Sequence, residues 1–375
     1  MHPPPRRLER AVAGISRGAD NIGRAVLRRL FLANERDAKT PEAFAAELAR
    51  LTPYTDPELL ADPDRMFPGA GVLIEPRAVL RRPLFHPSRR GPRRVEVGVA
   101  ERLSFATPYR PLSPDYAEEY ASYPEIATAH LWSWRHIQPA PVSLLLTHGW
   151  GVGQWRFHQR EFDVPTLFHT LGLDVYFYQA PFHAERTPAQ ARFGGELHPS
   201  SDLVRTNEAF IQTGTELRAI MSFILDRNPA PLGMMGSSLG GYTSALMASI
   251  DTRLDFVIPV LPPASFAHLL WDHGAGDSMR AEAERLGMSR DRFHRLWALH
   301  SPLSYTPKVP WARRMIVTAL GDTLVDADHT RDLWEHWERP RHFRFPGGHT
   351  WQLGRAQYHR EVARFLGDIG LTLGA

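Results

Sequence analysis

The stretch Gly236-Ser237-Ser238-Leu239-Gly240-Gly241 lies between an apolar run and a helix-forming run, and its spacing decides the fold that we predict. A G-x-S-x-G pattern places its serine at the tip of a tight turn between a buried strand and a helix. Gly236 and Gly240 lie two residues on either side of Ser238, where a Cβ would collide with its neighbours. Centring the pattern on Ser237 would put bulkier residues at both glycine positions. The spacing therefore favours Ser238 as a nucleophile.

The residues around this turn agree with a strand before it and a helix after it. Pro231 to Met235 suits a short buried strand, and Tyr242 to Ile250 suits a packed helix. Glycine and serine also fill ordinary turns, so the pattern alone has limited specificity. A nucleophilic turn of this kind further requires an acid and then a histidine downstream, in that order.

The composition is that of a globular protein with enough length for a sizeable core. The chain has 375 residues, of which 43% are hydrophobic and 23% are charged. It has no cysteine, which excludes a disulfide framework, a thiolate metal site and a cysteine nucleophile. No apolar run reaches the roughly 18 residues of a membrane span, and the N-terminus lacks a signal-peptide core. We therefore expect a cytoplasmic protein.

The positive charge comes almost entirely from arginine, since Lys39 and Lys308 are the only lysines and the formal net charge is +3. The arginines are scattered among acidic residues, which is usual for a solvated surface. We therefore do not expect nucleic acid binding.

A basic amphipathic helix is predicted near the N-terminus, with apolar residues at helical spacing at Leu8, Val12, Ile15, Ala19, Ile22, Val26 and Leu30. Its arginines suit peripheral contact with an anionic membrane surface. The alternative is packing on the main domain or on a second subunit of a homo-oligomer. We favour packing, because Asp20 and the glycines weaken the membrane pattern.

Two regions follow from the change of pattern along the chain. Residues 1–93 are expected to form a helical and irregular extension, because prolines interrupt every periodic pattern over residues 52–92. From about Arg94 strands alternate with helices, which predicts an α/β domain over residues 94–375, with a mostly parallel sheet and helices on both faces. A helical insertion is expected at about 264–300, before the strand that carries the acid.

The acid that we predict is Asp322, which directly follows the strand-forming run 314–320. A carboxylate there lies at the carboxyl edge of the sheet, where ligand-binding loops gather. Asp326 and Asp328 are rivals, because a loop can bring either of them to a histidine. An aspartate after a glycine is also common in a simple Asx turn.

His349 is the predicted base. It follows Gly347-Gly348 and the last strand, and it is third in the order Ser238, Asp322, His349. In this hypothesis His349 accepts the proton of Ser238, and Asp322 holds the ring in the required tautomer. The backbone N–H groups of Leu239 and Trp150 are the predicted oxyanion donors, with Gly151 as an alternative to Trp150.

These motifs resemble the α/β-hydrolase superfamily, through His148-Gly149-Trp150-Gly151, the turn at Ser238, Gly321-Asp322-Thr323-Leu324-Val325 and Gly348-His349. The resemblance runs from about Arg94 to the C-terminus. The longer stretch 148–156 is similar to the abhydrolase domain-containing protein 18-like group. The resemblance implies an α/β-hydrolase fold with an eight-stranded sheet, no cofactor, and hydrolysis of an ester, thioester or amide.

Two further stretches are candidates for substrate contact. His183 and Arg186 follow the strand-forming run 173–178 and could face the cleft, where they would meet a polar or anionic substrate. Either could equally be a hydrogen-bonded structural residue. In the insertion, Phe266, Leu269, Leu270 and Trp271 could line an acyl pocket, although such residues more often pack a lid against a core.

The function that we predict is a serine hydrolase acting on a carboxylic ester through an acyl-enzyme intermediate, with a small-molecule ester or acyl substrate. A thioesterase or an acyltransferase is the nearest alternative, and a non-catalytic scaffold with the same fold is a third. Serine at position 238 disfavours dehalogenase chemistry, which needs an aspartate there. We predict no metal, because no HExxH-like spacing occurs.

Overall fold

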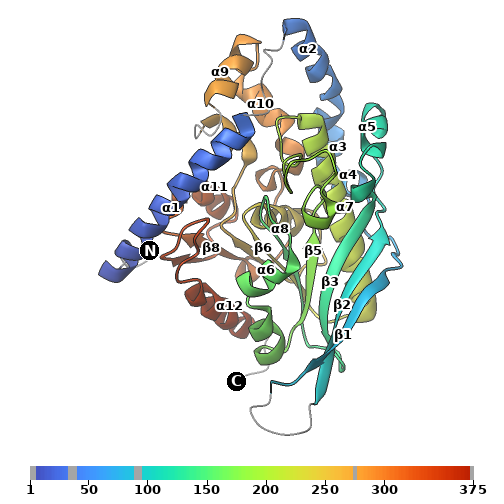
Figure 1. Cartoon of the computed structure of the whole chain (residues 1–375), viewed down its shortest axis with the longest axis vertical. Coiled ribbons are helices and arrows are strands. Elements are labelled where there is room, and N and C mark those ends of the chain that lie inside the picture. The colour runs from blue at the N-terminus through green and yellow to red at the C-terminus, as the bar shows by residue number, and fades with distance from the viewer. Residues whose placement is uncertain (1–5, 33–39, 88–94, 273–276, 372–375) are drawn as a thin grey trace.

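The computed structural model describes residues 6–32, 40–87, 95–272 and 277–371. In these residues one sheet has the strand order β1-β2-β3-β5-β4-β6-β7-β8-β9 (Figure 1). The strands are β1 (Arg77–Phe85), β2 (Glu96–Ala106), β3 (Thr128–His136), β4 (Ser143–Thr147), β5 (Asp174–Gln179), β6 (Leu232–Ser237), β7 (Phe256–Val260), β8 (Met315–Ala319) and β9 (Arg341–Phe345). The six strands from β5 to β9 in this order are mutually parallel, and β1, β2 and β3 are antiparallel to their neighbours.

The parallel strands β4 to β8 are buried because helices cover both faces of the sheet, whereas the edge strand β9 is mostly half-buried. One apolar core lies under α7 (Leu203–Arg227), α8 (Leu239–Ile250) and α11 (Ala327–His336). The second core lies under α6 (Trp155–Glu161) and α12 (Ala356–Asp368). Successive residues of one strand pack in different cores: Met234 of β6 lies in the first core and Met235 in the second. The predicted α/β sheet with helices on both faces is confirmed.

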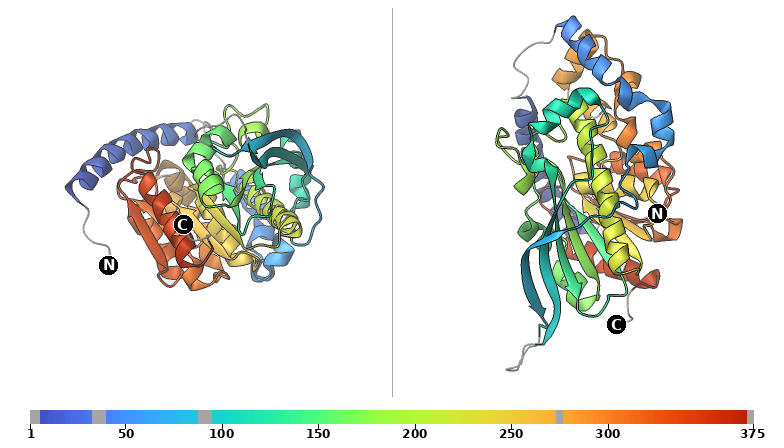
Figure 2. Two further views of the ribbon diagram at one scale, coloured as in Figure 1. Left: turned by 90° about the horizontal axis from the view of Figure 1, so that it is seen from below. Right: turned by 90° about the vertical axis from the view of Figure 1, so that its right-hand side faces the viewer.

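The prediction of eight strands was wrong, because the sheet has nine in the described residues. The additional strand β1 lies in the segment 52–92, which we had expected to be irregular, and it pairs with β2 at the edge of the sheet. Nearly all its residues are exposed, so it lacks the alternation of buried and exposed side chains that marks a strand in sequence. Figure 2 shows these long antiparallel strands projecting from the rest of the molecule.

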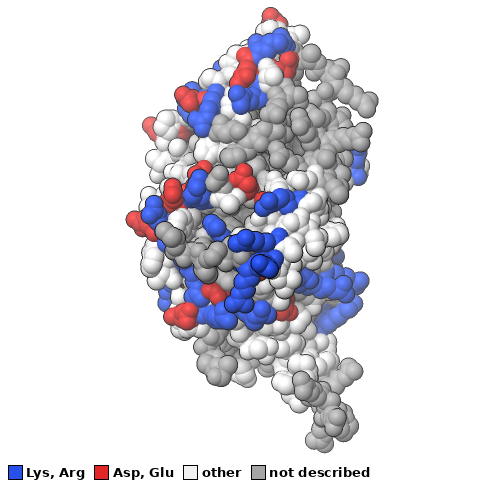
Figure 3. All heavy atoms as spheres, turned by 90° about the vertical axis from the view of Figure 1, so that its left-hand side faces the viewer, with Lys and Arg blue, Asp and Glu red and all other residues white. Residues whose placement is uncertain are grey.

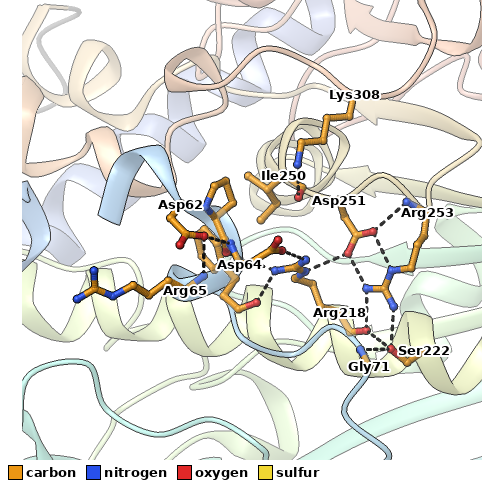
Figure 4. Close-up of polar contacts among 12 residues, drawn as sticks. Asp62, Asp64, Arg65, Gly71, Arg218, Ser222, Ile250, Asp251, Arg253 and Lys308 are labelled. Atoms are coloured by element: carbon orange, nitrogen blue, oxygen red, sulfur yellow. Dashed lines mark hydrogen bonds and ion pairs between the residues drawn. The ribbon is translucent and has the colours of Figure 1, made fainter. Parts of the chain in front are cut away.

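The rest of the segment 40–87 packs on the core of the sheet. The helices α2 (Pro41–Arg50), α3 (Pro57–Ala61) and α4 (Pro63–Met66) contribute to the same apolar cluster as α7. Arg218 of α7 binds this segment by donating to the carbonyl of Phe67 (2.6 Å) and by pairing with Asp64. Its Nε also donates to Asp251 (3.1 Å), at the end of α8 (Figure 4). The predicted boundary at residue 93 therefore falls between two strands of one sheet.

Short helices connect β7 to β8, in the region where we predicted a helical insertion. They include a π-helical turn (His268–Asp272), α9 (Asp277–Arg285) and α10 (Arg290–Leu296). Phe266 and Trp271 pack into the core beneath α7, and Trp271 is 4% exposed. These two side chains hold the insertion against the core.

The helix α1 (Arg7–Leu32) runs along the outside of the molecule, beside α11 and β8 (Figure 1; Figure 2). The predicted helix is confirmed, but its predicted apolar stripe is only partly covered over the described side chains, where Val12 and Ala19 are half-buried. Leu8 and Ile15 are 76% and 60% exposed, whereas Ala13, Ser16 and Asp20 are buried. No helix in the described ranges is long and apolar enough to cross a membrane.

Candidate active site

Ser238 occupies a sharp turn between β6 and α8. Its backbone has φ 55° and ψ −114°, a conformation that is costly for a residue with a Cβ. The turn also requires glycine on both sides, since a Cβ on Gly240 would lie 2.3 Å from the carbonyl oxygen of Thr147 in β4. A Cβ on Gly236 would lie 2.1 Å from the carbonyl oxygen of Gly240. The G-x-S-x-G spacing therefore has a steric cause in this turn.

His349 links Ser238 to Asp322 through hydrogen bonds. Its Nε2 is 2.7 Å from Oγ of Ser238, and its Nδ1 is 2.8 Å from Oδ2 of Asp322. The tautomer that satisfies both contacts has the hydroxyl donating to Nε2 and Nδ1–H donating to the carboxylate. Ser238 is half-buried, so its Oγ is accessible to a substrate, whereas Ser237 is buried and contacts Gln352. The structure thus brings together the three residues predicted from their order in the chain.

The orientation of Asp322 is set by its own loop. Its Oδ1 accepts hydrogen bonds from the backbone N–H groups of Leu324 (2.9 Å) and Val325 (2.8 Å), which leaves Oδ2 for His349. The rival Asp326 caps α11 by accepting from the N–H of His329 (2.9 Å). The side chain of Asp328 lies outside the part of the chain that the structure describes. Of the two rivals whose side chains are described, Asp322 and Asp326, Asp322 is the one in contact with the ring of His349.

Burial and nearby charges shift the pKa of His349 in opposite directions. The side chain of this residue is 13% exposed. Burial lowers the pKa of its imidazole, but the charge and hydrogen bond of Asp322 raise it, and the charges of Asp20 and Glu161 add to the increase. The net effect is a pKa above the ordinary value of a histidine. The site therefore stabilises an imidazolium, which is the form that a general base reaches after it has accepted a proton.

The loop after β4 lies directly against the nucleophile. A Cβ on Gly149 would be 3.4 Å from Cβ of Ser238. His148 holds this loop by donating from Nδ1 to the carbonyl of Gly149 (2.8 Å) and accepting at Nε2 from the N–H of Ala180 (3.0 Å). The indole of Trp150 donates to the carbonyl of Gly195 (2.7 Å). The predicted oxyanion donors, the N–H groups of Trp150 and Leu239, thus belong to the loop and the helix next to Ser238.

Comparisons with known proteins agree with this architecture. Residues 104–274 match the family described as alpha/beta hydrolase domain containing 18. An acetyl xylan esterase from Paenibacillus sp. R4 superposes with a TM-score of 0.58 and 12% sequence identity, covering 84% of this chain and 94% of that one. The acetyl xylan esterase 1 from Thermoanaerobacterium sp. JW/SL YS485 gives a TM-score of 0.53 and 13% identity over the same shares.

This chain has the α/β-hydrolase fold. Two curated proteins of Mycobacterium tuberculosis, both described as uncharacterized, are 31% identical to it over 242 residues, which are 63% of this chain and 56% of each relative. The chain thus spans little more than half the length of these relatives. The predicted resemblance is confirmed at the level of the hydrolase fold.

The predicted orientation of His183 and Arg186 toward a cleft is wrong, because the hydrolase fold buries both completely. Arg186 donates to both carboxylate oxygens of Glu216 in α7, at 2.7 and 2.8 Å. His183 donates from Nδ1 to the carbonyl of Pro181 (2.8 Å), and burial lowers the pKa of its ring to about 3. Both residues stabilise the interior, which sequence reasoning could not distinguish from a position at the mouth of a cleft.

Sequence reasoning missed the role of Asp20 in α1. The carboxylate of this fully buried residue accepts hydrogen bonds from the backbone N–H of His349 (2.6 Å) and of Thr350 (2.8 Å). In the sequence, Asp20 is one acid within a basic helix and belongs to no motif. Its contact joins the two ends of the chain, so no local pattern could have revealed it.

One cluster in the described residues could hold a metal ion. His268, His329 and Asp332 each offer a ligand atom, and these atoms lie within 4.8 Å of one another. The residues belong to the insertion and to α11, and none of them is Ser238, Asp322 or His349. The hydrogen-bonded chain at Ser238 is complete without this cluster.

Proposed function

We propose that this chain is a serine hydrolase that cleaves a carboxylic ester through an acyl-enzyme intermediate. The observation that carries the proposal is the placement of His349, with one ring nitrogen 2.7 Å from Oγ of Ser238 and the other 2.8 Å from Asp322. A serine hydroxyl is a weak nucleophile unless a base removes its proton during attack. The histidine lies at the distance that this transfer needs, and the aspartate stabilises its charged form.

The reaction then follows in two halves. Oγ of Ser238 bonds to the carbonyl carbon of the ester, while its proton passes to Nε2 of His349. The imidazolium returns this proton to the departing alcohol oxygen as the ester C–O bond breaks, which leaves an acylated Ser238. A water molecule repeats the sequence, giving its proton to His349 and its hydroxyl to the acyl carbon. The imidazolium returns this proton to Oγ as the bond between Oγ and the acyl carbon breaks, which releases the carboxylic acid and restores both the serine and the neutral histidine.

The negative charge of each tetrahedral intermediate needs hydrogen-bond donors that are already in place. The N–H of Leu239 suits this role, because it belongs to the first turn of α8, where backbone N–H groups lack partners within the helix. The N–H of Trp150 is the second donor that we propose, from the loop that lies against Ser238. The positive end of the α8 dipole favours the same charge.

An ester is the substrate class that we favour, and two esterases with the same fold support this choice. A thioester would give the same acyl-enzyme, and transfer to another acceptor would differ only in its second half. The acceptor and the leaving group therefore have to be distinguished by measurement. Location in the cytoplasm stays a prediction.

The test is to label the folded protein with a fluorophosphonate and to measure hydrolysis of p-nitrophenyl esters of increasing chain length. We expect one adduct by intact mass, located on Ser238, and activity that is lost in Ser238→Ala. Ser237→Ala is the matched control, since this neighbouring hydroxyl does not contact His349 in the structure. Labelling that persists in Ser238→Ala would refute the assignment of the nucleophile. A folded protein without adduct or turnover would favour a non-catalytic scaffold.

A further inference from the structure

The helix α1 contacts the rest of the molecule through small and polar side chains. Among the described side chains of this helix, residues 7–21, only Ala13, Ser16 and Asp20 are buried. They are spaced at helical intervals and so lie on one face. The large apolar side chains of Leu8 and Ile15 lie outside this face and are exposed.

This face meets the two loops that carry Asp322 and His349. A Cβ on Gly321 would lie 2.5 Å from the carbonyl oxygen of Ala13, and one on Gly348 would lie 2.6 Å from Oδ2 of Asp20. On the acid loop, Arg17 donates to the carbonyl of Leu320 (3.3 Å), and the hydroxyl of Thr323 donates to Asn21 (3.1 Å). The helix thus lies directly on both loops, with its backbone against the acid loop and the side chain of Asp20 against the histidine loop.

Asp20 makes the contacts closest to the reacting groups. It accepts one hydrogen bond at each carboxylate oxygen, from two successive N–H groups that start at His349. A charged acceptor forms stronger hydrogen bonds than a neutral one, and burial strengthens them further. The carboxylate therefore restricts the position of the His349 backbone.

We propose that Asp20 is a positioning residue of the active site, and that α1 acts as a clamp that holds the histidine loop in its reactive geometry. The inference rests on the proposed function, since it concerns the base of the same site. The clamp adds a helix from the N-terminal region to a site whose other residues follow strands of the sheet.

Over the described side chains of α1, residues 7–21, the fully buried residues are small or polar, so the contacts of this part of the clamp are mainly polar. Burial of apolar surface contributes about 25 cal/mol per Å², and alanine and serine offer little of it. A cavity of about 430 Å³ next to this contact is lined by residues of α1, β8, β9 and the acid loop, among them Arg17, Asp322 and Arg344.

Asp20 also acts on the charge of His349. Three carboxylates raise the pKa of this ring against the effect of burial: Asp322 through a hydrogen bond, Asp20 from α1, and Glu161 from α6. Glu161 is itself paired with His158 (2.6 Å). Replacing Asp20 by a neutral residue removes one of the three, so the pKa of His349 falls. The ring then stays neutral down to a lower pH.

The experiment compares Asp20→Asn with Glu9→Gln, which makes the same change of charge at the start of α1, where Glu9 accepts a hydrogen bond from the N–H of Arg6 (2.7 Å). The readouts are the pH profile of fluorophosphonate inactivation and the titration of the His349 ring by NMR, assigned with His349→Gln. For Asp20→Asn we expect a plateau rate roughly 10- to 100-fold lower, as for a displacement of the base by about 1 Å. We also expect the acid limb of the inactivation profile and the midpoint of the His349 ring titration to move to lower pH.

Glu9→Gln should leave the rate and both titrations unchanged. An Asp20→Asn protein with the wild-type rate and the wild-type titration of His349 would overturn the inference. A wild-type protein that is not labelled would refute the proposed function instead, and the ring titration would still test the effect of Asp20. If Asp20→Asn does not fold, as judged by circular dichroism, Asp20→Ser serves as the second variant. Failure of both to fold would show that Asp20 serves stability, and would also overturn the inference.

Discussion

The carboxylate of Asp20 and the backbone N–H of His349 are 2.6 Å apart, although 329 positions separate the two residues in the chain. The contact joins the N-terminal helix to the loop that carries the proposed base. The backbone of His349 is therefore bound from α1 as well as by its own loop, in which the N–H of Gly348 donates to the carbonyl of Trp351 (2.9 Å).

Asp322→Asn should lower kcat for ester hydrolysis by about 10⁴-fold, because an amide in place of the carboxylate favours the wrong tautomer of His349. Asp326→Asn is the matched control, since that side chain caps α11 and does not contact His349 in the structure. It should cost about 1 kcal/mol of stability or less and leave kcat within a few fold. Equal losses in both variants would contradict the assignment of the acid. The measurement is steady-state hydrolysis of a p-nitrophenyl ester.

The pH profile of kcat/KM should have an acid limb above the ordinary histidine value of about 6.5. Burial lowers the pKa of His349, but Asp322, Asp20 and Glu161 together raise it above that value. A base must be neutral to accept a proton, so activity is present above this raised pKa and is lost as the pH falls through it. Stopped-flow measurement over pH 4 to 10 checks the prediction, at roughly constant ionic strength. An acid limb well below 6.5 would be incompatible with it.

Arg186→Met should destabilise the protein by about 3–5 kcal/mol, because it leaves Glu216 charged in the interior without its partner. Glu216 also accepts from Tyr178 (2.6 Å) and Thr107 (2.6 Å), and both residues of the ion pair are fully buried. Denaturant unfolding measures the effect, and the double variant Arg186→Met/Glu216→Gln should recover part of the loss. Arg285→Met is the control, since both side chains of its ion pair with Glu282 are about half exposed, at 54% and 40%. A changed KM with unchanged stability would instead favour substrate contact.

The outer face of α1 carries basic and apolar side chains that suit peripheral contact with a membrane. Arg7, Arg10 and Arg17 are exposed on this helix, together with Leu8 and Ile15. On the side of the molecule where α1 lies, Lys and Arg side chains outnumber acidic ones over the lower half of the view (Figure 3). We predict binding to anionic vesicles that falls with salt.

Co-sedimentation with vesicles of about 30% anionic lipid measures this binding. Near such a membrane surface each basic residue contributes about 1 kcal/mol. The variant Arg7→Gln/Arg10→Gln should bind more weakly, roughly tenfold, at unchanged hydrolysis of a soluble ester. The control is Arg81→Gln/Arg82→Gln on β1, which removes the same charge from an exposed strand. Equal binding by all three proteins would exclude the helix as the contact surface.

The sequence alone predicted the features that depend on neighbours in the chain. The turn at Ser238 could be recognised because glycine is required two residues on either side, where a Cβ would meet the backbone of β4 or of the turn itself. Asp322 and His349 could be selected because each follows a strand of the sheet. The carboxyl ends of parallel strands meet at one edge of a sheet, so their order and spacing are sufficient to place them together.

Tertiary structure decided the features that depend on distant parts of the chain. The strand β1 is exposed along nearly its whole length and has no apolar alternation to show that it pairs with β2. Arg186 lies inward because Glu216, on another helix, neutralises its charge there. Asp20 is buried because it finds two N–H groups at the opposite end of the chain. A charged side chain is buried only where a partner compensates its desolvation, and that partner is known only once the chain has folded.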